Sequence, residues 1–326
     1  MKQFRNVLVY AETPDAACLE RVVELAVRHG ITMTVCDVIE PSPQLPDPEG
    51  TLARLHTLGW QRALERLRAL CSPHMNRIEL DYSVLVGNPF LVITEQVLQQ
   101  RFDLVVHISD TGTVSSNGGL NPTGMHLIRK CPCAVWSMHP GEPPQSCNLV
   151  LAVDRDLAAS TDAADDATLE LLAAARFVAR PGAVVQLVHA WQPFGADLLL
   201  DERAGFTATE SERYLASIAE DYTTWFDALL TRLCAVAPEL KFVPHLKRGT
   251  VTQVIPALVR QTRPELVLMR TIGTSNVPGV LIGTQAEAIL STTSTPILAL
   301  KPRGFRTPLR FPARAASDHP QSAASG

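Results

Sequence analysis

Three landmarks in this sequence recur at one constant spacing of 162 residues. The pairs are Gly87 with Gly249, Asp103-Leu-Val-Val106 with Glu265-Leu-Val-Leu268, and Val135 with Ile297. Two unrelated segments rarely keep a single offset across three landmarks, so the two halves of the chain are internal repeats. The repeat restricts the chain to a fold that is built twice.

Short apolar runs alternate with amphipathic helical patterns in both halves. The predicted strands lie at residues 6–11, 31–38, 78–86, 103–107 and 133–138, and again at 148–153, 184–191, 240–246, 265–269 and 296–300. Apolar strands that alternate with helices are typical of a parallel, doubly wound α/β sheet. We expect one such domain in residues 1–142 and a second in 143–303, joined by a Pro-rich linker at 140–144. Residues 304–326 are expected to form a disordered tail.

Charge and hydropathy exclude several classes of protein. The net charge of −4 argues against a nucleic-acid-binding protein, which is expected to be basic. No apolar run reaches the length of about 18 residues that a membrane-spanning helix needs. Seven cysteines form an odd number without framework spacing, and the N-terminus leads straight into a strand without room for a signal peptide. We therefore expect a cytoplasmic protein.

One stretch of the second half has the pattern of a phosphate-binding loop. An apolar run, Leu266 to Met269, leads into a small-residue loop that contains Gly273 and Gly279, and Gly283-Thr284 then begins a helical pattern. Glycines let the backbone approach a ligand, and the amides and partial positive charge of a helix N-terminus favour anions. The loop is the principal candidate for a nucleotide site.

Enzyme and metal motifs are absent from the sequence. We find no P-loop, nucleophile-elbow, zinc-protease or dinucleotide-binding signature, and so predict no catalytic residues. Cys131-Pro-Cys133 with His126 offers too few ligands for a tetrahedral metal site, and these cysteines are expected in the core or at a strand start. His107 and His189 lie at the ends of predicted strands, near where ligands bind, and a buried, hydrogen-bonded histidine is favoured over a ligand contact for each. The acidic run Asp162, Asp165 and Asp166 is expected to precede a helix, where it complements the helix dipole.

The closing segments of the second half match a known pattern. Gly273-x9-Gly283-Thr284 is followed by Ala286-Glu-Ala-Ile-Leu290 and then by Thr295-Pro-Ile-Leu298. In the first half, Pro122-Thr123, Leu127-Ile-Arg-Lys-Cys-Pro132 and Val135-Trp136 are similar to the corresponding segments of two-domain proteins. The chain resembles the universal stress protein family in its tandem form, over nearly all of residues 5–302. Nucleotide-binding members of that family carry G-x2-G-x9-G-[ST] in this loop.

The resemblance implies two flavodoxin-like (HUP-type) domains, each a five-stranded parallel sheet of order 3-2-1-4-5 flanked by helices. It implies ATP, AMP or another adenine nucleotide in the second domain, and Mg²⁺ only where a triphosphate is bound. The implied contacts are with the nucleoside at Val153 and Asp154, with the base near Ala190, and with the phosphates at Arg270, Gly273, Gly279, Gly283 and Thr284.

Two departures from the family pattern bear on that expectation. Arg270 replaces the first loop glycine, where it either contacts a phosphate or fills the loop. In the first half, the loop positions hold Thr111, Asn117, Asn121 and Pro122, and proline removes an N–H from the helix start. Tyr10-Ala-Glu12 stands where Val153-Asp154 would, without a clean match for the acid. The first half is therefore expected to keep the fold without the phosphate chemistry.

Three functions agree with the sequence. The first is a stress-associated protein that binds a nucleotide, hydrolyses ATP slowly at most, and acts through its conformation or its partners. The second is a nucleotide-independent interaction scaffold, and the third an enzyme acting on a small phosphorylated or acyl substrate. A homodimer and unidentified protein partners are the expected macromolecular contacts, with no membrane and no specific nucleic acid.

Overall fold

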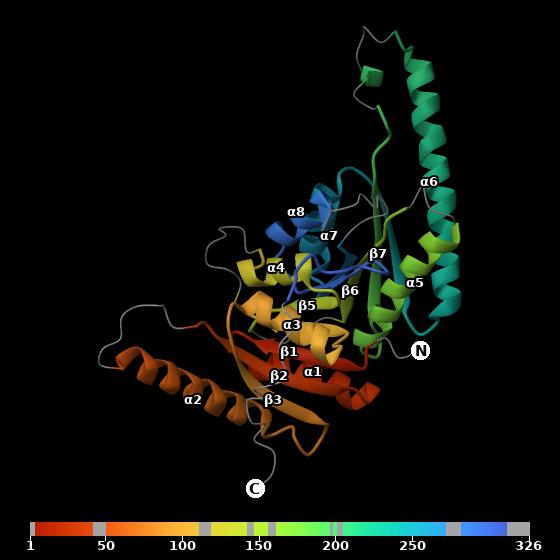
Figure 1. The fold of residues 1–326 in the computed structure, drawn as a ribbon. Helices are drawn as coiled ribbons and strands as arrows, with labels where there is room; N and C mark the ends of the chain where they lie inside the picture. Colours follow the sequence, from red (N-terminus) through yellow and green to blue (C-terminus); the bar gives the residue numbers. More distant parts are fainter. Residues whose placement is uncertain are drawn as a thin grey trace. The chain divides into compact units, whose positions relative to one another are not determined.

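The computed structural model describes residues 4–41, 50–110, 119–141, 147–155, 161–195, 198–200, 205–271 and 282–311. The chain forms two compact units (Figure 1). The first comprises residues 1–143 together with 296–326, and the second comprises residues 144–295. The last strand of the second repeat thus belongs to the first unit.

The first unit is an α/β sheet with flanking helices. Its elements are β1 (Asn6–Ala11), α1 (Ala16–His29), β2 (Thr32–Ile39), α2 (Thr51–Cys71), β3 (Leu80–Val86), α3 (Pro89–Gln100), β4 (Leu104–Ile108), α4 (Pro122–Lys130), β5 (Ala134–Met138) and β10 (Ile297–Leu300). The strands β3-β2-β1-β4-β5 follow one another in parallel, and β10 pairs antiparallel with β5.

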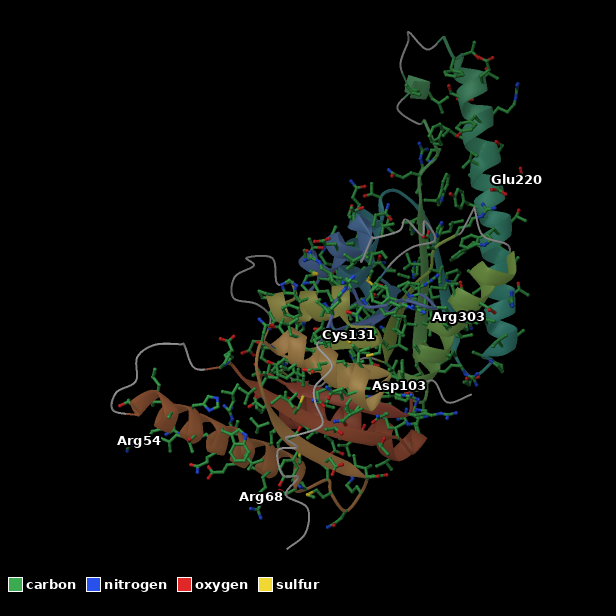
Figure 2. The ribbon with its side chains drawn as sticks, viewed as in Figure 1. Arg54, Arg68, Asp103, Cys131, Glu220 and Arg303 are labelled. Carbon is green, nitrogen blue, oxygen red and sulfur yellow. The ribbon has the colours of Figure 1, made fainter. Side chains whose placement is uncertain are left out.

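Local sequence explains these elements. β1 and β4 are apolar runs that are almost wholly buried, as expected of parallel strands with both faces covered. Helix α1 begins at the N-cap Asp15, which accepts a hydrogen bond from the Cys18 amide at 2.7 Å, and it ends at Gly30 in the left-handed region. Helix α2 buries a narrow face and leaves residues such as Arg54 and Arg68 exposed (Figure 2).

The second unit repeats the alternation of strands and helices. Its elements are β6 (Asn148–Ala152), α5 (Thr161–Val178), β7 (Val184–Trp191), the short 3-10 helix η1 (Leu198–Leu200), α6 (Ala208–Val236), β8 (Lys241–Arg248), α7 (Val251–Thr262), β9 (Leu266–Arg270) and α8 (Thr284–Thr292). The strands β8-β7-β6-β9 pair in parallel. Counted from the start of its own half, the strand order is 3-2-1-4-5 in each half, which confirms the predicted fold class.

Backbone hydrogen bonds align the two halves at their first strands. The amide of Asp103 donates to Asn6 O at 3.0 Å, and the amide of Glu265 donates to Asn148 O at 2.9 Å. Asn6 and Asn148 therefore occupy the same place, although their spacing is shorter than the 162 residues that separate Asp103 from Glu265. The second half has gained its extra residues between its first and third strands, where α6 is longer than α2.

The prediction for the start of α5 is wrong. The helix begins at Thr161, so that Asp162, Asp165 and Asp166 lie within its first turns and not in front of it. Alanines interspersed among the acids favour helix strongly enough to extend it.

Among the described residues, no helix is long and apolar enough to cross a membrane.

Candidate functional site

A cavity of about 410 Å³ lies in the second unit at the carboxyl ends of its strands. Its walls come from the ends of β6, β7 and β9 and from α5, α7 and the first turns of α8. Ligands of open α/β sheets bind at this edge. Six predicted site residues line it together: Val153, Asp154, Ala190, Arg270, Gly283 and Thr284. The other two, Gly273 and Gly279, lie outside the described residues.

The end of β6 is tied to β7 at the cavity wall. The Val153 amide donates to Val188 O at 3.0 Å, and Nδ1 of His189 lies 3.0 Å from Val153 O. A carbonyl only accepts hydrogen bonds, so Nδ1 carries the proton. Burial lowers the pKa of His189 below its ordinary value, despite the opposing effects of this bond and of Asp154. The imidazole is therefore neutral near pH 7, and it fixes the position of Val153 beside Asp154.

Gly283 has a backbone that other residues could adopt. It is the N-cap of α8 with φ −69° and ψ 144°, its amide donates to Thr271 O at 2.9 Å, and its carbonyl accepts from the Glu287 amide at 2.9 Å. A Cβ added here would meet Thr271 O at 3.8 Å, an ordinary contact. Among the described residues, neither strain nor crowding requires glycine. What a Cβ would occupy is space at the cavity wall.

Arg270 lies at the end of β9 and lines the same cavity. Its Nε atom is buried without a hydrogen-bond partner among the described residues. A buried donor that lacks a partner costs free energy, which an anionic ligand would recover.

Sequence reasoning missed three polar lining residues. Thr168 lies on α5 and Gln285 on the first turn of α8, while His189 lies near the end of β7 and was interpreted as a buried histidine in preference to a ligand contact. Gln285 directly follows the predicted Gly283-Thr284, and this adjacency was the available signal. Thr168 lies on a helix that begins earlier than predicted, so the sequence did not indicate which side of this helix lines the cavity.

Two aromatic side chains of α6 pack against the imidazole of His189. Tyr222 stacks on the imidazole at 5.5 Å between centroids, and Trp225 meets it edge-on at 4.8 Å. Arg155, the residue after Asp154, lies over both rings and pairs with Asp221 at 2.6 Å. The cluster holds the chain that follows β6 against α6, and so positions Asp154.

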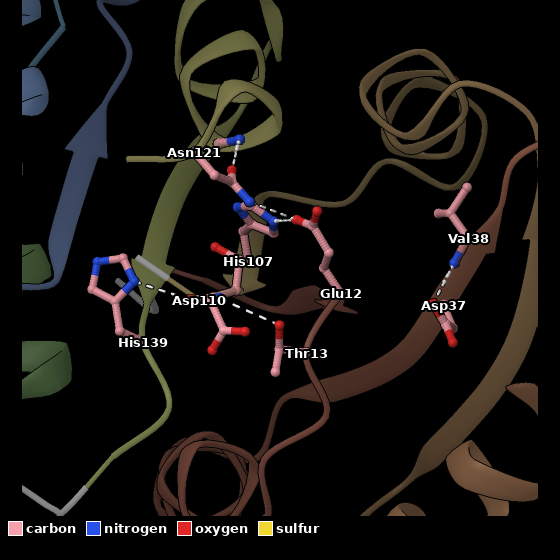
Figure 3. Close-up of polar contacts among 10 residues, drawn as sticks. Glu12, Thr13, Asp37, Val38, His107, Asp110, Asn121 and His139 are labelled. Atoms are coloured by element: carbon pink, nitrogen blue, oxygen red, sulfur yellow. Dashed lines mark hydrogen bonds and ion pairs between the residues drawn. The ribbon is translucent and has the colours of Figure 1, made fainter. Parts of the chain in front are cut away.

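The first half has different chemistry at the corresponding place. Glu12 follows β1 as Asp154 follows β6, and its Oε2 accepts from Asn121 Nδ2 at 2.9 Å and lies 2.6 Å from His107 Nε2 (Figure 3). Asn121 also caps α4, because its Oδ1 accepts from the Gly124 amide at 2.8 Å. The structure corrects the sequence comparison here: the acid is present as Glu12, and it is engaged by protein groups.

Comparison with known proteins gives one consistent result. The model of the universal stress protein family matches residues 3–139 and 150–301. Universal stress protein E of Salmonella typhi is 24% identical, with 95% of this chain and 98% of that protein covered.

Two solved structures share the fold. A functionally unknown protein from Pseudomonas aeruginosa PAO1 is 17% identical, with 92% of this chain and 94% of that chain covered at a TM-score of 0.58. A universal stress protein from Archaeoglobus fulgidus is 13% identical, with 92% and 99% covered at a TM-score of 0.56. At these identities the likeness concerns the fold alone.

Proposed function

Because this chain belongs to the universal stress protein family in its tandem form, we propose that its second half binds an adenine nucleotide, ATP or AMP. The site is the cavity lined by Asp154 and Gly283. Binding shifts the conformation of the protein or its association with partners, and ATP is hydrolysed slowly at most. The role is that of a nucleotide-responsive stress protein and not of an enzyme.

The observation that carries this proposal is the pairing of Arg270 with Gly283 at one cavity. Arg270 offers a buried Nε donor without a partner among the described residues, and Gly283 leaves the start of α8 open where no backbone strain requires glycine. A guanidinium and a helix N-terminus both favour phosphate. Arg270, which departs from the family pattern, is on this proposal a phosphate ligand that replaces the missing loop glycine.

Other residues that line the cavity suit a nucleoside. Val188, Ala190 and Ile255 supply apolar surface, and Asp154 supplies a carboxylate that can accept from ribose hydroxyls. A volume of about 410 Å³ lies within the range of about 300–1,000 Å³ usual for small-molecule sites. Contacts from Gly273 and Gly279 to the phosphates remain predictions, as does Mg²⁺ beside a triphosphate.

Nucleotide binding alone does not explain regulation. A ligand shifts a conformational equilibrium only by its difference in affinity for the two states.

One universal stress protein was crystallised in complex with cAMP. That fact concerns that protein, and the nucleotide named for the present chain is our own proposal.

The first half provides the substitutions that test the site. Gly283→Asn with Thr284→Pro reproduces Asn121-Pro122, in which asparagine caps its own helix and proline occupies the first helical position. Calorimetric titration with ATP and AMP should give binding by the wild type and a loss of at least about tenfold in the variant. Because both substitutions favour helix initiation, the melting temperature should be unchanged or raised.

The matched control is the reverse exchange in the first half, Asn121→Gly with Pro122→Thr, which should leave the affinity for nucleotide unchanged. Equal binding by the wild type and the Gly283→Asn, Thr284→Pro variant would place the nucleotide elsewhere. No binding by the wild type would instead favour the scaffold that acts without nucleotide.

A further inference from the structure

Two cysteines of the first unit lie side by side, close to a half-buried lysine. The Sγ atoms of Cys131 and Cys133 are 3.6 Å apart on the turn between α4 and β5 (Cys131 is labelled in Figure 2). Cys131 is fully buried, whereas Cys133 is half-buried. The two sulfurs are in van der Waals contact, and a disulfide needs their separation to fall to about 2.05 Å.

Lys301 is the charged group beside this pair. It follows β10, its Nζ donates to Ile128 O in the last turn of α4, and it lies 4.5 Å from the Phe305 ring. Burial lowers the pKa of Lys301 to about 8, although the two thiols oppose the shift. Its ammonium favours a thiolate on either sulfur, which offsets the unfavourable carbonyl end of α4.

Burial alone raises the pKa of Cys131, but the hydrogen bond from Cys133 and the charge of Lys301 outweigh it, and the pKa lies below the ordinary value of a thiol. The pKa of Cys133 is raised above the ordinary value of a thiol, because burial and the neighbouring Cys131 both disfavour a second negative charge. The first of the two thiol protons is thus readily lost, and the two sulfurs share the one that remains. A shared thiolate beside a cation is typical of reactive cysteines, whereas structural cysteines in apolar surroundings are inert.

We propose that Cys131 and Cys133 form a redox-active dithiol that closes to a disulfide by exchange with low-molecular-weight disulfides such as oxidised glutathione. The half-buried Cys133 is the sulfur that the reagent reaches, after its proton has passed to Cys131. Lys301 promotes the exchange by stabilising the thiolate. This property belongs to the first half and does not depend on nucleotide binding in the second.

The chemistry balances in two exchange steps. The Cys133 thiolate attacks one sulfur of the reagent, the reagent's S–S bond breaks, and one glutathione leaves with the electron pair as a thiolate. Cys131 then loses its proton and attacks Sγ of Cys133, which expels the second glutathione. Two protons pass to the two released thiolates, the dithiol is oxidised by two electrons, and the reagent is reduced by two.

The experiment uses the full chain with Cys147→Ser and Cys234→Ser, which remove the two other cysteines that are not buried. This parent is incubated with oxidised glutathione at pH 7.5 and read by mass spectrometry of the intact protein and of the peptide 131–155. We expect the peptide to lose two hydrogen atoms and to retain no glutathione. Unmodified thiols at both positions, or a glutathione that stays attached, would overturn the proposal.

Single substitutions in the same parent separate the two sulfurs. Cys131→Ser should accumulate glutathione on Cys133, because no resolving thiol remains, and Cys133→Ser should stay unmodified, because Cys131 is buried. The reverse pattern would contradict the assigned order of attack. Thermal melting of each variant shows that the fold is retained.

Substitutions at Lys301 test the role of the charge. Lys301→Met should slow oxidation at pH 7 by about tenfold, the effect of raising the thiol pKa by about one unit, and Lys301→Arg should restore most of the rate. An unchanged rate in Lys301→Met would remove Lys301 from the mechanism. A rate lost in both variants would show that Lys301 acts by packing and not by charge.

Discussion

Nε2 of the buried His107 lies 2.6 Å from Oε2 of Glu12, at the end of the first strand of the first half. The corresponding residues of the second half, Met269 and Asp154, line the cavity proposed for the nucleotide. One repeat has therefore engaged its acid in a contact within the protein, while the other directs the same position to a cavity. The contact of Glu12 within the protein predicts that this acid contributes to stability.

Glu12→Gln should lower the free energy of unfolding at pH 7 by about 1–2 kcal/mol. This value is the contribution of a charge-assisted hydrogen bond, reduced because the carboxylate is partly exposed to solvent. Burial alone raises the pKa of Glu12, but the hydrogen bond and charge of His107 outweigh it, and the pKa lies below its ordinary value. This stabilisation is complete above the unfolded pKa of about 4.3 and is lost as the pH falls through the folded pKa.

Urea unfolding from pH 7 to pH 3 measures this effect. The difference between wild type and Glu12→Gln should shrink as the pH falls below about 4.3. Glu95→Gln is the control, because the half-buried Glu95 accepts a hydrogen bond from Gln99 on the same helix, and it should change stability by less than about 0.5 kcal/mol. A difference between wild type and Glu12→Gln that persists at pH 3 would contradict the ionic origin of the stabilisation.

Arg270→Ile tests whether the arginine binds phosphate or fills space. At the 162-residue spacing its counterpart is Ile108, which is fully buried, so isoleucine is already accepted at this strand end in the first half. We expect the affinity for ATP to fall about 10- to 100-fold, as a lost charge-assisted contact implies, with stability unchanged or improved. Titration calorimetry and thermal melting measure the two effects.

Arg260→Ala is the matched control for that titration. Arg260 is exposed on α7 and outside the cavity, so its removal changes the net charge equally without touching the site. Its affinity for ATP should match that of the wild type. Equal losses in both variants would indicate a nonspecific charge effect and would assign Arg270 to packing.

The repeat and its strands could be predicted from sequence because both are local or periodic properties. Apolar runs such as Leu104–Ile108, and the constant spacing between matching positions of the two halves, can be recognised without any knowledge of contacts. The match between Glu12 and Asp154 could not be found in that way. Their spacing differs from 162 residues because the second half is longer between its first and third strands, and only the backbone bonds of Asn6 and Asn148 align them.

The partners of a side chain are likewise invisible in one sequence. Lys301 lies beside Cys131 although 170 positions separate them, and His189 reaches the Val153 carbonyl across two strands. Both contacts depend on tertiary packing. The sequence indicated core cysteines and a histidine near the ligand-binding edge, but it gave no reason to connect the cysteines with Lys301 or the histidine with the Val153 carbonyl.

His189 should remain neutral well below the ordinary histidine pKa. Burial lowers its pKa, so between pH 6.5 and the folded value the unfolded chain binds a proton that the folded chain does not. Its contribution to stability is complete above pH 6.5 and decreases as the pH falls. NMR titration of the imidazole should give a midpoint below about 6.5. A midpoint above that value would contradict the neutral imidazole that is hydrogen-bonded to the Val153 carbonyl.

Gly87 and Gly249 occupy the same turn in the two halves and should respond differently to alanine. Both have φ near +145°, and their amides donate to Ile39 O and Trp191 O. A Cβ on Gly87 would lie 2.5 Å from Val92 Cγ1, whereas on Gly249 the nearest atom, Val254 Cγ2, is 3.2 Å away. Gly87→Ala should therefore cost about 2–3 kcal/mol and Gly249→Ala about 1–2 kcal/mol.

Gly59→Ala is the control of opposite sign for this pair. Gly59 lies inside α2 with open space around its Cβ position, so alanine should raise the free energy of unfolding by about 0.5–1 kcal/mol through its helix propensity. Urea unfolding of the three alanine variants measures the order. Equal costs for Gly87→Ala and Gly249→Ala would mean that the left-handed backbone alone sets the penalty, because contact with the valine would then contribute nothing.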